Sequence, residues 1–113
     1  MIQFGTGGWR AIIGDDFTRA NIQRVAAALA RRMKREGADK KGLCIGYDRR
    51  FLSRESAIWF SEVMAAENVP LYFVNLAAPT PQIMFTVRYM DLPYGAAVTA
   101  SHNPAVYNGI KLF

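Results

Sequence analysis

Short apolar runs alternate with segments of helical periodicity along the chain, and this alternation is the feature that most constrains the fold. The apolar runs are residues 43–47, 71–74 and 94–99, and the helical segments begin at Thr18, Ser53 and Thr80. Strands that alternate with helices are typical of a layered α/β domain. The length of 113 residues predicts one domain.

The first helical segment has the clearest boundaries. Thr18 is expected to be its N-cap and Gly37 its C-terminal stop. Its apolar stripe consists of Ile22, Val25, Ala26, Leu29 and Met33. Ser53 is expected to cap the second helix, and Thr80 the third, with Pro81 at its first position. The side chains of the third helix expected to face the core are Ile83, Met84, Val87 and Met90.

The last sixteen residues, 98–113, predict a strand, a polar loop and a returning strand. Pro104 stops the first strand, because proline fixes φ and lacks a donor. Asn108 and Gly109 both tolerate positive φ, so they predict a tight reversal. Residues 110–113 then run antiparallel, which makes the sheet mixed although mostly parallel. Ser101 lies in this loop, and Lys111 lies on the returning strand.

Composition limits the class of protein. Half of the residues, 51%, are hydrophobic, which is enough for a core. The single cysteine, Cys44, excludes a disulfide within the chain and fits a reducing compartment. No apolar run reaches the length of a membrane-spanning helix, and the N-terminus is not a secretory signal. We therefore predict a soluble, cytoplasmic protein with no membrane partner.

Basic residues are concentrated in residues 31–35 and 40–41, within a net charge of +5. A solvated helix end explains such a cluster, since cations complement the negative end of a helix dipole. Nucleic-acid binding is disfavoured, because no aromatic interleaving or binding motif accompanies the charges. The charge also suits a small anionic substrate but does not select one.

Two further features have an ordinary reading when each is taken alone. The three glycines in residues 4–10 predict a hairpin, although their amides could also receive a phosphate beside Arg10. Ser101 and His102 are adjacent on an extended backbone, so their side chains point to opposite sides. They are not by themselves a nucleophile and its base.

Residues 99–104 (Thr-Ala-Ser-His-Asn-Pro), followed by residues 107–111 (Tyr-Asn-Gly-Ile-Lys), closely resemble the active-site serine loop of the α-D-phosphohexomutases. That family includes phosphoglucomutases and phosphomannomutases. Residues 4–10 and 46–53 resemble two other motifs of the same family, in the same order. The resemblance covers essentially the whole chain and implies the first domain of the family, a three-layer α/β/α unit.

The resemblance implies an intramolecular phosphotransferase. Ser101 would carry a phosphoryl group and donate it to a hexose phosphate, through a bisphosphate intermediate. The net reaction would move phosphate between the 1- and 6-positions. Lys111 and Arg10 resemble the residues that the family uses for proton transfer at the sugar hydroxyl. The implied cofactors are Mg²⁺, bound through the phosphoryl group on Ser101, and glucose 1,6-bisphosphate as activator.

The resemblance also assigns supporting roles near the serine. Thr6 and Gly7 would bind phosphate or substrate. His102 and Asn103 would orient the loop and the phosphate. The structural residues at the floor of the site would be Asp48 and Arg50.

Several family motifs are missing from the sequence, including the aspartate-rich metal loop and the sugar-selecting loop. The chain therefore resembles only the first of four domains, spanning residues 1–113 and cut short at its C-terminal end. We expect the isolated chain to be inactive without the remaining domains. We also expect copies to associate through apolar residues left uncovered at the truncated edge, namely Ile110, Leu112 or Phe113.

A second hypothesis comes from a different functional class. The same basic loop would serve a non-catalytic module that binds a phosphosugar or another anion, or an interaction module, without turnover. Phosphorylation of Ser101 distinguishes the two, because only a donor domain needs it. Thr99 slightly favours glucose or mannose phosphates as the hexose substrates.

Overall fold

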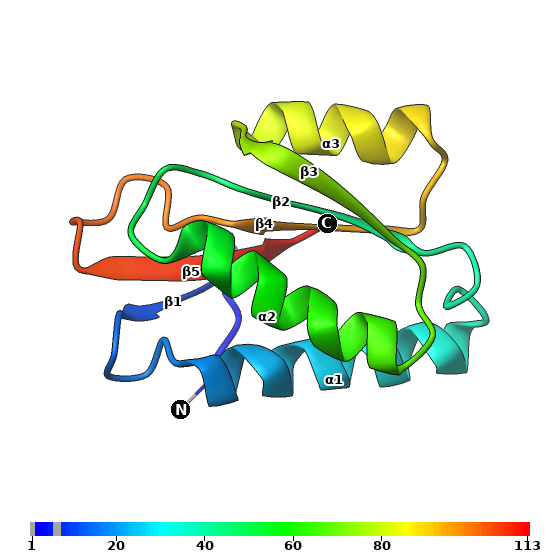
Figure 1. The fold of residues 1–113 in the computed structure, drawn as a ribbon, viewed down its shortest axis with the longest axis horizontal. Helices are drawn as coiled ribbons and strands as arrows, with labels where there is room; N and C mark the ends of the chain where they lie inside the picture. Colours follow the sequence, from blue (N-terminus) through cyan, green and yellow to red (C-terminus); the bar gives the residue numbers. More distant parts are fainter. Residues whose placement is uncertain (1, 6–7) are drawn as a thin grey trace.

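The computed structural model describes residues 2–5 and 8–113, which form one five-stranded sheet and three helices (Figure 1). The elements in chain order are β1 (Trp9–Ile12), α1 (Arg19–Glu36), β2 (Leu43–Tyr47), α2 (Ser53–Ala66), β3 (Leu71–Ala77), α3 (Thr80–Tyr89), β4 (Tyr94–Val98) and β5 (Tyr107–Leu112). The strand order is β1-β5-β4-β2-β3. This alternation confirms the predicted α/β fold.

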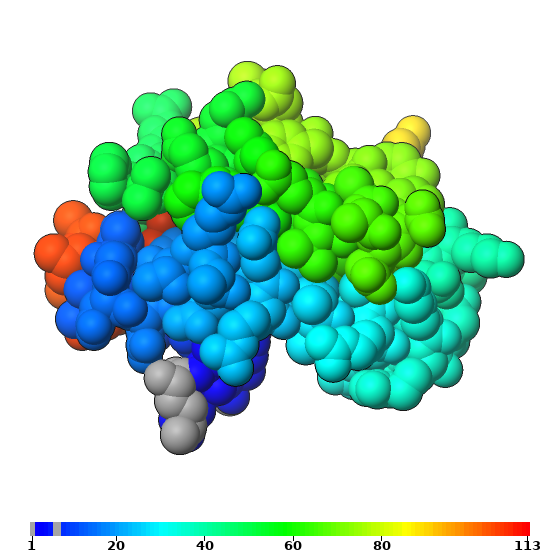
Figure 2. All heavy atoms as spheres, turned by 60° about the horizontal axis from the view of Figure 1, so that its bottom comes forward, coloured from blue at the N-terminus to red at the C-terminus, as the bar shows by residue number. Residues whose placement is uncertain are grey.

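The sheet is mixed, as the sequence predicted. β2 pairs in parallel with both β3 and β4, whereas β5 is antiparallel to β4 and to β1. Four strands therefore point one way and β5 points the other. Helices α1 and α2 lie side by side on one face of the sheet, and α3 covers the other (Figures 1 and 2). The three layers enclose two clusters of buried side chains, one beneath α1 and α2 and a smaller one beneath α3.

Local signals set the boundaries of α1. The Thr18 hydroxyl accepts a hydrogen bond from the Asn21 amide at 3.3 Å, and Gly37 ends the helix in the left-handed region at φ 73°. Glycine adopts this conformation without the steric cost that a Cβ brings. The predicted apolar stripe is buried, and it belongs to the core cluster that α1 shares with α2 and the sheet. Both predicted caps of this helix are confirmed.

The predicted caps of the other two helices are wrong. Leu52, in the left-handed region at φ 63°, precedes α2. The Ser53 hydroxyl donates to the Asp48 carboxylate instead, at 2.7 Å. Pro79 precedes α3, so Thr80 is already helical.

Two side chains of α3 also differ from the prediction. Ile83 and Val87, four residues apart, form the buried stripe of this helix. Met84 and Met90 lie beside that stripe and are 42% and 39% exposed. A ten-residue helix on one face of a sheet buries only a narrow line of side chains.

The predicted reversal at Asn108 and Gly109 is also wrong, because both residues lie inside β5. The chain turns earlier, in two hydrogen-bonded turns that span residues 100–103 and 104–107. Gly109 is needed for a different reason. A Cβ built on it would lie 2.2 Å from the Trp9 carbonyl oxygen, so glycine allows β1 and β5 to approach closely.

In the N-terminal glycine segment Gly5 and Gly8 pair with each other, as a hairpin requires, and a strand that was not predicted follows. Gly5 and Gly8 exchange two backbone hydrogen bonds of 3.1 Å. β1 follows as one edge of the sheet. Trp9 on this strand is buried, with its ring 5.2 Å from that of Phe17.

The apolar residues of β5 and the residue that follows it are less exposed than expected. Ile110 is fully buried, so the prediction that it is uncovered is wrong. Phe113 exchanges two backbone hydrogen bonds with Gly95, at 2.6 and 2.9 Å, and is half-buried, as is Leu112. Self-association through these residues stays a prediction. Within residues 2–5 and 8–113, no helix is long and apolar enough to cross a bilayer.

Candidate active site

Two loops meet at the edge of the sheet where β2 and β4 end. Residues 48–52 follow β2, and residues 99–106, which we call the serine loop, follow β4. The antiparallel pair of β1 and β5 extends beyond this edge. Val98 at the end of β4 pairs with Ile110, whereas β5 continues to pair with β1 as far as Tyr107 opposite Ile12. The β1–β5 pair therefore flanks the serine loop on one side. In open α/β sheets, this edge is where ligands bind.

Ser101 is exposed and has a left-handed backbone, with φ 54°. A non-glycine residue in this region is uncommon, and such residues concentrate at functional sites. The Ser101 amide donates to the Thr99 hydroxyl at 3.0 Å, and the Asn103 amide donates to the Ala100 carbonyl at 3.0 Å. These bonds hold the turn that presents the serine to solvent.

The guanidinium group of Arg50 holds the serine loop through hydrogen bonds. Arg50 donates hydrogen bonds to four backbone carbonyls of the loop and of the start of β5. The acceptors and donor–acceptor distances are Ser101 at 2.8 Å, Asn103 at 2.6 Å, Pro104 at 2.9 Å and Tyr107 at 3.1 Å. A guanidinium has five N–H donors in a rigid plane, so it can hold several carbonyls in one arrangement. Arg50 thus holds these four carbonyls of the loop and of the start of β5.

Arg50 is itself held by a polar network. The Asp48 carboxylate accepts from the Arg50 amide at 2.9 Å and from the Ser53 hydroxyl at 2.7 Å, and its second oxygen lies 3.7 Å from Arg50 Nε. Asn108, fully buried in β5, donates to the Ser53 hydroxyl at 2.9 Å and to the Phe51 carbonyl at 3.1 Å. The network links β5, the start of α2 and the serine loop. In this network Asp48 connects Arg50 to the start of α2; its predicted structural role stays a prediction.

Sequence reasoning missed the roles of Asn108 and Ser53 in this network. The sequence pattern indicates a turn at Asn108, because this residue precedes a glycine. It indicates a helix cap at Ser53, because this residue precedes an amphipathic segment. Both interpretations use local sequence alone. The true partners of Asn108 lie more than 50 residues away along the chain. The sequence around Asn108 carries no signal for this role, because an asparagine before a glycine is typical of a turn.

Arg10, on β1, connects the β1–β5 pair to the serine loop. Its guanidinium donates to the Asn103 side-chain oxygen at 2.7 Å, across 93 residues of sequence. Arg10 pairs with Gly109 in the sheet, and Lys111 is two residues further along β5. Side chains two residues apart on a strand share a face, so Arg10 and Lys111 lie on the same face of the sheet. Gly109 leaves the space between them free of a side chain.

Positive charge dominates the site. Its cations are Arg10, Arg49, Arg50 and Lys111, whereas Asp48 is its one carboxylate among the described residues and is already paired with Arg50. Arg49 is exposed and lines a hollow beside the serine loop with Phe51 and Asn103. Neither Lys111 nor Arg49 has an ion-pair partner in the described part of the chain. The arrangement can therefore receive an anionic group.

The other predicted ligands have different outcomes. Asn103 is half-buried and joined to Arg10, as expected of a residue that orients the loop. His102 is exposed and makes no hydrogen bond within the described residues. Thr6 and Gly7, predicted to bind phosphate, lie outside the described residues.

The described residues do not by themselves fit a magnesium ion. They include no group of three histidine, cysteine, aspartate or glutamate side chains that could bind a metal. Asp48, the carboxylate closest in sequence to this edge, already accepts hydrogen bonds from Arg50 and Ser53. Mg²⁺ prefers oxygen ligands from carboxylates and phosphates. A phosphoryl group on Ser101 would be the ligand that this loop could offer.

Comparisons with known proteins agree with the geometry. The family model for phosphoglucomutase/phosphomannomutase, alpha/beta/alpha domain I, matches residues 1–113. A phosphoglucomutase of Staphylococcus haemolyticus is 36% identical over 99% of this chain, and one of Staphylococcus saprophyticus is 33% identical over all of it. The chain spans only 21% of the length of each of these relatives.

Solved structures show the same fold. A Thermus thermophilus protein assigned as a phosphomannomutase superposes with a TM-score of 0.91, at 37% identity, over 98% of this chain and 25% of its own. A phosphoglucomutase/phosphomannomutase family protein from Burkholderia thailandensis gives a TM-score of 0.81 at 23% identity, over 99% of this chain and 26% of its own. The second likeness concerns the fold alone.

Proposed function

Because the chain belongs to the phosphoglucomutase/phosphomannomutase family, we propose that it is the part of a hexose-phosphate mutase that carries the transferable phosphoryl group on Ser101. The observation that carries this proposal is the clamp that Arg50 makes on the serine loop. Phosphoryl transfer needs in-line positioning and charge neutralisation more than covalent assistance. A fixed loop that exposes a serine among cations meets both needs.

In the proposed reaction, the bond between phosphorus and Ser101 Oγ breaks, and a bond forms between phosphorus and a hydroxyl oxygen of the hexose phosphate. Lys111, in its neutral amine form, accepts the hydroxyl proton, and a proton is returned to Ser101 Oγ as this oxygen leaves phosphorus. Arg10 balances the charge of the phosphoryl oxygens. The product is a hexose bisphosphate and an unmodified serine. After the intermediate turns over, its other phosphoryl group returns to Ser101, and the net change moves phosphate between the 1- and 6-positions.

Other functions belong to the rest of a longer enzyme in this proposal. The chain spans about a fifth of the curated relatives' length, so sugar selection and the carboxylates for Mg²⁺ come from outside it. Glucose or mannose phosphate is the proposed substrate, glucose 1,6-bisphosphate the activator and the cytoplasm the location. We expect the isolated chain to have no measurable mutase activity, and a robust rate from it would contradict that expectation.

The test is the intact mass of the purified chain before and after incubation with glucose 1,6-bisphosphate and Mg²⁺. The expected result is the gain of one phosphoryl group, which Ser101→Ala abolishes. A gain that persists in this variant would contradict the assignment of Ser101. Binding of a hexose phosphate without any gain would instead favour a non-catalytic phosphosugar-binding module.

A further inference from the structure

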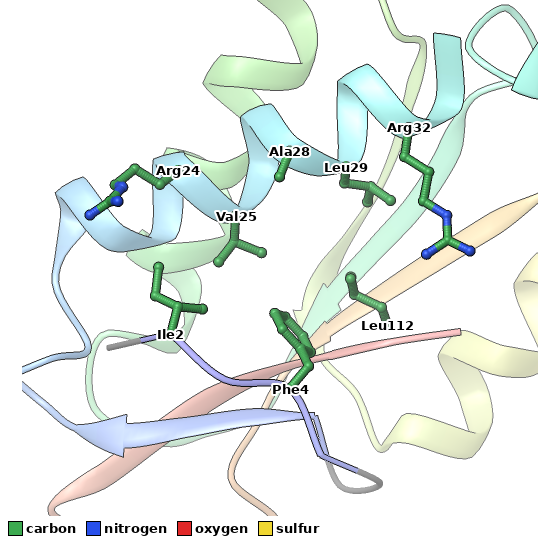
Figure 3. Close-up of a pocket in the computed structure, with 8 residues that line it drawn as sticks. All are labelled: Ile2, Phe4, Arg24, Val25, Ala28, Leu29, Arg32 and Leu112. Carbon is green, nitrogen blue, oxygen red and sulfur yellow. The ribbon is translucent and has the colours of Figure 1, made fainter. Parts of the chain in front are cut away.

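A second feature lies beside α1, on the face of the sheet that α1 and α2 cover, and does not depend on the function proposed above. A groove of about 380 Å³ separates α1 from the N-terminal segment and the end of β5. Figure 3 shows Val25 and Leu29 pointing into it from α1, while Ile2, Phe4 and Leu112 point towards α1 from below. Phe4 is 46% exposed.

Three residues of α1 line the rim of this groove at regular spacing. Arg24, Ala28 and Arg32 follow one another at intervals of four residues, so they form one line along α1. All three are exposed. The small Ala28 in the centre lets another backbone approach closely. The two arginines lie at opposite ends of the groove, about 12 Å apart along the helix axis at ~1.5 Å per residue (Figure 3).

The charges at this rim are available to a partner. None of the described lining residues is acidic. Arg24 makes one long hydrogen bond, 3.4 Å to the Asn21 side-chain oxygen. Arg32 pairs with Glu36 at 3.1 Å on the exposed surface, where an ion pair is weak and exchangeable. Arg31 and Arg35, also exposed on α1, make this side of the molecule still more basic.

We propose that this groove binds an acidic amphipathic helix of another protein. Apolar side chains of that helix would enter the groove at three- or four-residue spacing, which is how helices occupy such grooves. Two carboxylates about eight residues apart would reach Arg24 and Arg32. A second copy of this chain is a poor occupant, because its basic α1 and its net charge of +5 would be repelled by the arginines at the rim of the groove.

The probe for the test is a fluorescein-labelled synthetic helix with a leucine stripe and two glutamates eight residues apart. A matched peptide carries lysines in place of these glutamates. Fluorescence anisotropy with the 113-residue chain should show binding of the glutamate peptide alone. Arg24→Glu should weaken binding about tenfold, and the double reversal of Arg24 and Arg32 to glutamate should transfer binding to the lysine peptide.

Three further variants separate the groove from general charge. Ala28→Trp fills the groove and should abolish binding, with an unchanged circular dichroism melt as proof of folding. Glu36→Gln frees Arg32 and should strengthen binding. Arg35→Glu, on the same helix but outside the groove, should change affinity less than Arg24→Glu.

Four results would overturn the proposal. The first three are equal binding of both peptides, no binding of the glutamate peptide, and an Arg35→Glu effect as large as that of Arg24→Glu. The fourth is the binding of a different occupant in the groove. Phosphatidylglycerol vesicles that bind through Arg24 and Arg32 in the absence of peptide binding would identify a membrane surface. Self-association that Ala28→Trp abolishes in analytical ultracentrifugation would identify a second copy.

Discussion

The serine loop and the α1 groove both depend on arginine, but they use it in opposite ways. Arg50 is 16% exposed and turns its donors inward, onto four carbonyls of its own chain. Arg24 is exposed and makes a single long hydrogen bond within the described chain. The same side chain is thus a structural support in one region and a free charge in the other.

The surrounding backbone explains this difference. The serine loop exposes carbonyls that no strand or helix partner satisfies, so a planar donor beneath it completes their hydrogen bonding. Helix α1 satisfies its own carbonyls, and arginines on its outer face therefore have no backbone acceptor to bind. Whether an arginine is structural follows from the unsatisfied groups around it rather than from its type.

The largest effect should come from Arg50→Ala. This change removes the Arg50 donors from four carbonyls, of which that of Pro104 keeps the Tyr107 amide as a donor. It should lower the free energy of unfolding by about 2–3 kcal/mol in urea denaturation. Hydrogen exchange at the amides of residues 101–107 should accelerate. Arg24→Ala is the matched control and should change stability by less than about 0.5 kcal/mol. Equal effects of the two substitutions would remove the contrast between the two regions.

A smaller effect is expected from Asn108→Leu, which preserves approximate volume. The Phe51 carbonyl would lose the donor that Asn108 provides in the core, so stability should fall by about 1–2 kcal/mol. The serine loop should also become more mobile, because Ser53 and Asp48 lose one support of their network. An unchanged exchange rate in residues 101–107 would show that Arg50 holds the loop without this network.

The smallest effect concerns Glu36, which belongs to the groove side of the comparison. A hydrogen bond from the Tyr94 hydroxyl, and then one from Arg32, lowers the pKa of this carboxyl below its ordinary value of 4.5. A carboxyl with a lowered folded-state pKa stabilises the fold above its unfolded pKa. That contribution should disappear as the pH falls below about 4.5.

Glu36→Gln should therefore flatten the acid side of the curve of melting temperature against pH, without changing its neutral plateau greatly. The measurement is a series of thermal melts between neutral and acidic pH. Curves of identical shape for the two proteins would show that the Tyr94 and Arg32 contacts carry no stability.

The sequence predicted best what local interactions decide. Thr18 and Gly37 end α1 through bonds and dihedral angles within a few residues, so their types were sufficient. The alternation of strands and helices was likewise enough for the α/β class. The family resemblance placed Ser101, Asp48 and Arg50 at one edge of the sheet, and the structure brings their loops together there.

Long-range interactions account for the errors. Asn108 and Gly109 have the types of a turn, but Gly109 is selected by the close approach of Trp9 and Asn108 by the distant Ser53. Ser53 has the type of a cap, but its hydroxyl has a stronger acceptor in the carboxylate of Asp48. No property of the neighbouring residues reveals the partners of Asn108 and Gly109, which exist only after the strands have paired. Asp48 is only five residues from Ser53, but the turn between β2 and α2 brings the two side chains together.

The antiparallel pairing of β1 with β5 has a consequence for the order of folding. Residues 9–12 leave the ribosome well before their partner strand, residues 107–112, which is made nearly a hundred residues later. Domains fold as units during synthesis, and contacts distant in sequence form late. The nascent chain therefore holds its first strand unpaired until β5 emerges. Until that moment β1 has no sheet to hold Arg10 beside Asn103, so the serine acquires this part of its surroundings only after β5 has paired.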